Sequence, residues 1–74
     1  MKTKENYDAE DSLLLFCIQY KVYYFIHSDA MGFYGHLFDR ESNAGNVIVG
    51  TERFRLREDA VKALLDKSEK KAAR

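Results

Sequence analysis

Apolar and aromatic residues follow one another with little interruption from Leu13 to Ile26, and the same character returns over residues 33–38 and 47–49. Residues 13–20, 22–28 and 33–39 are rich in the aromatic and β-branched side chains that favour strands. Two segments rich in turn-forming residues, 28–32 and 41–46, separate the later runs. A fourth extended run covers residues 46–54. The pattern therefore predicts an antiparallel meander of about four strands.

The first of these runs has a second interpretation. Six consecutive apolar residues, 13–18, show no helical period, which favours a strand. However, the connection at residues 19–21 lacks the Gly, Asn or Asp that a two-residue hairpin prefers. A helix over Ala9–Tyr20, capped by Asp8, is the alternative.

The last segment has the pattern of an amphipathic helix. Its apolar residues recur at the spacing of one helix face: Leu56, Ala60, Val61, Leu64 and Leu65. Acidic residues occupy its first turn and lysines lie near its end, and both placements suit the helix macrodipole. We expect a helix over about residues 57–71, packed on one face of the sheet. The predicted fold is α+β, with a single domain over residues 13–74.

The predicted strands have no polar face. A sheet with one covered face should alternate apolar and polar residues, yet both sets are apolar here. One helix, about 10–12 Å across, cannot cover four strands that span roughly 19 Å. A second copy of the same surface would cover the remainder. We predict a homodimer with this interface: Leu14, Phe16, Ile18 and Tyr24. A helical 9–20 segment that covers this face within one chain is the alternative.

Composition narrows the class of protein. The 74 residues include 12 basic and 12 acidic side chains, so the net charge is zero, which argues against a strongly basic nucleic-acid binder. A single cysteine, Cys17, excludes an internal disulfide. Residues 1–12 are net acidic, so we expect a flexible tail rather than a signal peptide. The apolar run is shorter than the ~20 residues of a membrane helix. We therefore expect a cytoplasmic protein without a membrane partner.

Three arginines, Arg53, Arg55 and Arg57, alternate with apolar residues. In an extended chain their guanidinium groups would form a row able to bind phosphates or an acidic protein surface. Alternatively, they protect an edge strand from aggregation. The predicted partner-binding residues combine this row with loop residues: Arg53, Arg55, Arg57, Asp29, Met31, Arg40 and Glu41. We expect a protein partner, and nucleic acid bound by the arginines and sheet tyrosines is the alternative.

The sequence offers little material for catalysis or cofactor binding. His27 and His36 are close enough in sequence to meet across neighbouring strands, but two ligands do not complete a zinc site. Cys17 lies in the most apolar run, where a thiolate is disfavoured. The chain has neither a Gly-rich phosphate loop nor the spacing of a catalytic triad. We predict a non-catalytic protein without a metal or cofactor.

Residues 33–65 resemble modules of three strands and a helix, such as the AP2-like domains of phage integrases. In those modules an aromatic residue precedes a helix with an acidic first turn followed by Ala, as Phe54, Glu58 and Ala60 do here. Leu56 departs from the pattern, because a capping Thr often stands at that position. The resemblance implies nucleic-acid binding and assigns no site residues.

Overall fold

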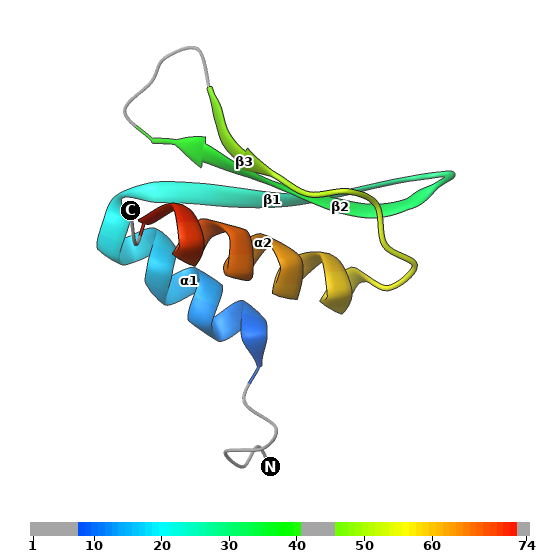
Figure 1. The fold of residues 1–74 in the computed structure, drawn as a ribbon, viewed down its shortest axis with the longest axis horizontal. Helices are drawn as coiled ribbons and strands as arrows, with labels where there is room; N and C mark the ends of the chain where they lie inside the picture. Colours follow the sequence, from blue (N-terminus) through cyan, green and yellow to red (C-terminus); the bar gives the residue numbers. More distant parts are fainter. Residues whose placement is uncertain (1–7, 41–45, 73–74) are drawn as a thin grey trace.

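The computed structural model describes residues 8–40 and 46–72. The chain runs through helix α1 (Ala9–Tyr20), strands β1 (Val22–Asp29), β2 (Gly32–Asp39) and β3 (Val47–Gly50), and helix α2 (Arg57–Ala72). The three strands form one antiparallel sheet, and both helices lie on the same side of it (Figure 1). The predicted α+β class with an antiparallel sheet is therefore confirmed, and so is the C-terminal helix.

The predicted strand over residues 13–20 is wrong, because this segment belongs to α1. The Asp8 carboxylate caps the helix by accepting a hydrogen bond from the backbone N–H of Glu10. At the other end Lys21 adopts a left-handed conformation, with φ of 58°, and its N–H donates to the carbonyl of Cys17. This one residue connects α1 to β1, so no hairpin is needed. Residues 8–12 thus belong to the helix and its cap, and the rest of the predicted tail lies outside the described residues.

The sheet has three strands in the order β1-β2-β3, not four. β1 and β2 pair along their whole length, from Val22 opposite Asp39 to Asp29 opposite Gly32. Of the residues in the predicted strand over 46–54, only those of β3 form a regular strand. Beyond it, Phe54 forms an isolated bridge in which it exchanges two backbone hydrogen bonds of 2.7 Å with Phe33.

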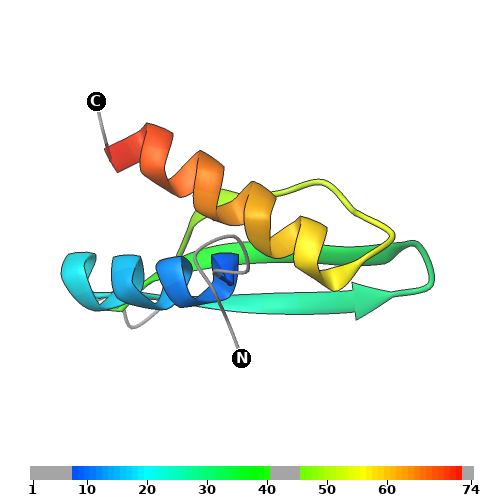
Figure 2. The same ribbon diagram turned by 90° about the horizontal axis from the view of Figure 1, so that it is seen from below.

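The hydrophobic core lies between the sheet and the two helices. From the helical side, α1 and α2 are inclined to each other and cross the same sheet face (Figure 2). The core consists of buried residues from every element: Leu13, Cys17, Val22, Leu37, Val49, Val61 and Leu64. Two helices thus cover the face for which we expected one. Within residues 8–40 and 46–72, neither helix has the length and apolar character needed to cross a membrane.

Candidate functional site

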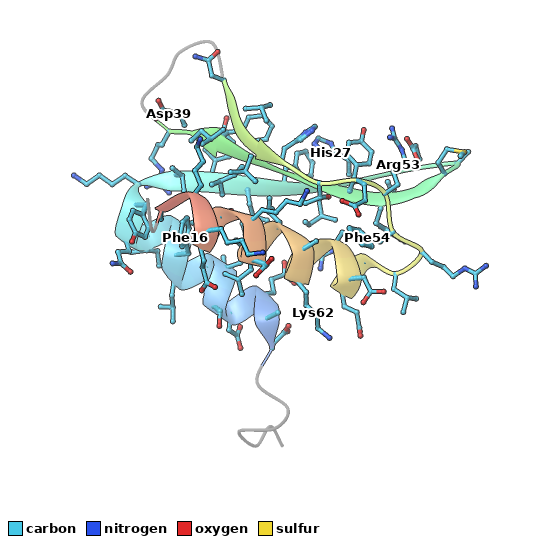
Figure 3. The ribbon with its side chains drawn as sticks, viewed as in Figure 1. Phe16, His27, Asp39, Arg53, Phe54 and Lys62 are labelled. Atoms are coloured by element: carbon cyan, nitrogen blue, oxygen red, sulfur yellow. The ribbon has the colours of Figure 1, made fainter. Side chains whose placement is uncertain are left out.

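The sheet face opposite the helices is covered with aromatic rings. Side chains alternate between the two faces of a strand, so β1 and β2 each place three rings on this open face. We call these six residues the ring cluster: Tyr23, Phe25, His27, Tyr34, His36 and Phe38. In the β1–β2 register they form three facing pairs. No described helix lies over them, and Figure 3 shows His27 pointing away from α1 and α2.

The rings contact one another across the strands. Tyr23 stacks on Phe38 with 5.1 Å between ring centroids, and His27 stacks on Tyr34 at 4.8 Å. His36 meets Phe38 edge-on at 5.9 Å. Such ring pairs contribute roughly 0.5–1.5 kcal/mol each beyond their buried area. The cluster is therefore an ordered apolar surface rather than a set of separate exposed side chains.

Two histidines contact each other within the ring cluster. Nδ1 of His36 lies 3.0 Å from Nε2 of His27, so one ring donates a hydrogen bond to the other. Desolvation, and the proximity of His27, lower the pKa of His36. This shift favours the neutral form of the His36 imidazole.

Arg53 lies at one end of the open face, and a carboxylate compensates its charge. Its Nε donates to Oδ2 of Asp29 at 2.8 Å, and its Nη2 lies 2.7 Å from the same oxygen. The guanidinium carbon of Arg53 also lies 4.4 Å from the centre of the Tyr34 ring. Figure 3 shows Arg53 on the same side of the sheet as His27. The hydrogen bond from Arg53, and the backbone N–H of Met31, lower the pKa of Asp29.

The predicted arginine row does not form. Arg57 begins α2 and binds Glu10 of α1 through two hydrogen bonds, of 2.8 and 3.0 Å. Tyr24 donates from its hydroxyl to the same carboxylate. Arg57 therefore lies at the contact between the helices and β1, whereas Arg53 belongs to the open face. Arg55 is exposed between them, in a segment without regular strand structure.

The other predicted partner-binding residues are dispersed. Met31 is exposed at the β1–β2 turn, on the same end of the sheet as Asp29. Arg40 lies at the opposite end, where it donates to the carbonyl of Val22 at 3.4 Å. Glu41 lies outside the described residues.

The residues predicted to form the dimer interface do not share one sheet face. Leu14 and Ile18 are exposed on α1, and Phe16 packs against Tyr20 on the same helix with 4.4 Å between ring centroids. Tyr24 is part-buried on the helix-covered side of β1. In β1 the prediction chose the alternating set of residues that contains Tyr24. The open face is formed by the opposite alternating set of β1 and β2, the ring cluster.

Comparisons with protein-family models, with curated proteins and with solved structures find no match for this chain. The chemistry of the site must therefore be judged from its own residues. Among the described residues, no three His, Cys, Asp or Glu side chains are grouped so that they could hold a metal ion. Cys17 is buried, and desolvation raises the pKa of its thiol, which disfavours the nucleophilic thiolate. What the open face offers is a flat apolar surface for binding.

Proposed function

We propose that this chain is a non-catalytic interaction module that forms a homodimer through the open face of its sheet. The observation behind the proposal is the ring cluster: six ordered rings on a sheet face that neither described helix covers. Contiguous apolar patches of several hundred Å² on a soluble protein mark sites of association. Aromatic residues are also enriched in protein interfaces. A cytoplasmic location remains part of the proposal, supported by the single reduced Cys17.

A second copy suits this face because its rings are mostly apolar and the one arginine at its end, Arg53, is already paired with Asp29. Two aligned sheets pack about 10 Å apart with their side chains interdigitating, and a two-fold axis brings the same rings together from both copies. Two strands of eight residues and one of four give a plan area on the order of 330 Å². That area is less than half of the ~800 Å² per partner in a standard interface. We therefore expect a weak dimer, with a dissociation constant in the micromolar range.

Nucleic acid is the less favoured occupant. Stacking of bases on exposed rings needs neighbouring cations to bind the phosphates. Of the predicted arginines, Arg53 lies on the open face but is bound to Asp29, whereas Arg57 lies on the side of the helices, bound to Glu10. Binding of a single-stranded oligonucleotide that weakens steeply with salt would favour this alternative over the dimer.

The proposal can be tested with two charge-introducing variants on opposite sides of the molecule. Phe25 and Leu15 are matched controls for each other, because they are 59% and 60% exposed, on the open face and on α1 respectively. We expect F25E to abolish the dimer in sedimentation equilibrium and L15E to leave it intact, with both variants retaining the wild-type circular dichroism. A wild-type monomer at hundreds of micromolar, or a dimer lost only in L15E, would overturn the proposal.

A further inference from the structure

The histidine pair of the ring cluster occupies the part of the open face that a second copy would approach. His36 lies on the central strand and faces Phe25, in the middle of the three ring pairs. Its neighbour on β3 is Gly50. A Cβ at Gly50 would lie 3.1 Å from Cδ2 of His36, so the imidazole occupies the space that the glycine leaves. His36 is only part-buried there, so some of its ring is exposed on the open face.

Two imidazole nitrogens this close can bind one metal ion. Tetrahedral zinc with Zn–N bonds of 2.0–2.1 Å places its ligand nitrogens about 3.3 Å apart. The observed separation of Nδ1 in His36 and Nε2 in His27 is 3.0 Å, so the nitrogens are close to this spacing. Both rings would also have to rotate, so that their lone pairs point to a common ion instead of along the hydrogen bond.

The described part of one chain supplies only half of the ligands that a closed zinc site needs. Structural zinc sites have four protein ligands, and within residues 8–40 and 46–72 no third His, Cys, Asp or Glu joins the pair. The rings around the pair are apolar or neutral: Phe25, Tyr34 and Phe38. The described residues of one chain therefore leave two ligand positions open, and a second copy offers the same two imidazoles for them.

We propose that His27 and His36 bind a Zn²⁺ ion together with the same two residues of a second copy, so that four imidazoles close a metal site on the two-fold axis of the dimer. This inference rests on the proposed dimer through the open face. Sheets packed ~10 Å apart require each pair to reach about half that distance, which is within the length of a histidine side chain. In a two-fold interface only residues at the axis meet their own copies, so the axis passes beside the pair.

Proton balance at the site is simple. Without metal, each neutral ring holds one proton, and one of these protons lies between Nδ1 of His36 and Nε2 of His27. When zinc binds both nitrogens, that proton exchanges through water to the far nitrogen of its own ring. The exchange within a pair of neutral rings releases no net proton.

The test uses the full chain without an affinity tag, stripped of metal by a chelator and then titrated with Zn²⁺. We expect one Zn²⁺ per two chains in a competition titration with a chromophoric chelator. Sedimentation equilibrium should show the dimer at least tenfold tighter with zinc. Replacing Zn²⁺ by Co²⁺ should give the visible absorption of a tetrahedral site.

A double variant, His27→Gln with His36→Gln, separates this proposal from the proposed dimer. Gln keeps polar side chains at both positions but removes the imidazole ligands. We expect it to dimerise as the metal-free wild type does, without any response to zinc. A metal-free dimer that takes up no zinc, or one whose zinc binding survives the double variant, would overturn the metal site alone. Zinc bound at one per monomer, without a change in mass, would do the same. A chain that stays monomeric with and without zinc would overturn both proposals.

Discussion

Glu10 joins α1, β1 and α2 at one carboxylate, and its removal should measurably destabilise the fold. Arg57 donates two hydrogen bonds to it and Tyr24 donates a third. The hydrogen bonds from Arg57 and Tyr24 together lower the pKa of Glu10 from 4.5 to about 2. The same contact raises the pKa of Tyr24 to about 12, for which burial is the larger cause. The phenol therefore remains a donor across the whole working range of pH.

The size of the effect follows from the pKa. A fall from 4.5 to about 2 at 1.36 kcal/mol per pKa unit sets an upper limit of roughly 3 kcal/mol. Solvent reduces this value, because the Arg57 side chain is 50% exposed although that of Glu10 is only 24% exposed. We expect Glu10→Gln to lower the free energy of unfolding by about 1–2 kcal/mol at pH 7.

The direction of the pH dependence is fixed by the lowered pKa. The contribution is complete above the unfolded pKa of 4.5 and is lost as the pH falls through the folded value of about 2. The difference between wild type and E10Q should therefore shrink between about pH 5 and pH 2. Urea unfolding followed by circular dichroism, at one fixed protein concentration, measures it.

Glu58→Gln is the matched control for this experiment. Glu58 is an exposed carboxylate in the first turn of α2, as Glu10 is in the first turn of α1, so both interact with a helix N-terminus. We expect E58Q to change stability by less than about 0.5 kcal/mol. If E10Q and E58Q cost the same at pH 7, or if the cost of E10Q is unchanged at pH 3, the carboxylate does not hold the three elements together.

Three further substitutions test the packing. Leu13→Ala should cost about 2–5 kcal/mol in urea unfolding, because Leu13 is completely buried, whereas Leu15→Ala should cost less than about 0.5 kcal/mol; equal costs would contradict the orientation of α1. Gly32→Ala should cost about 1–3 kcal/mol in the same assay, since Gly32 has φ of 131° and an added Cβ would lie 2.4 Å from the Phe54 carbonyl oxygen. Ser68→Ala should leave stability unchanged or raise it by up to about 1 kcal/mol, because the buried Ser68 hydroxyl has no hydrogen-bond partner among the described residues; a loss in thermal unfolding would show that the hydroxyl has one.

Periodicity could not distinguish helix from strand at residues 13–20 because α1 is apolar on most of its surface. Leu13 and Cys17 are buried at a spacing of one helical turn, but Leu15 and Ile18 are exposed on the outside. The deciding features are at the ends of the segment. The Asp8 cap is visible in the sequence, whereas the left-handed conformation of Lys21 is not, since non-glycine residues seldom adopt it.

The strand alternation correctly separated the two faces of β1 and β2, but it did not show which face the helices cover. Both sets of residues are apolar, so their hydropathy alone could not show which set faces the core. Gly35 was the available signal. A Cβ there would lie 3.0 Å from Cδ2 of Leu64 and 3.1 Å from Cδ1 of Ile26, so the glycine marks where α2 approaches the sheet. The pairing of Arg57 with Glu10 joins residues 47 positions apart, and no local pattern predicts such a contact.

Two exposed apolar surfaces remain, on opposite sides of the molecule. The better interface is the one whose side chains have less conformational freedom to lose on association. On α1, the side chains of Leu14, Leu15 and Ile18 are exposed, and burying them would cost about 0.5–1.5 kcal/mol for each side chain whose freedom is lost. The rings of the open face have already lost much of that freedom, because they stack on one another across β1 and β2. Association through the sheet therefore has the smaller entropic cost for each side chain that is buried. The same order places the two imidazole nitrogens 3.0 Å apart before any ligand arrives, so the features that favour a dimer also favour a shared metal ion.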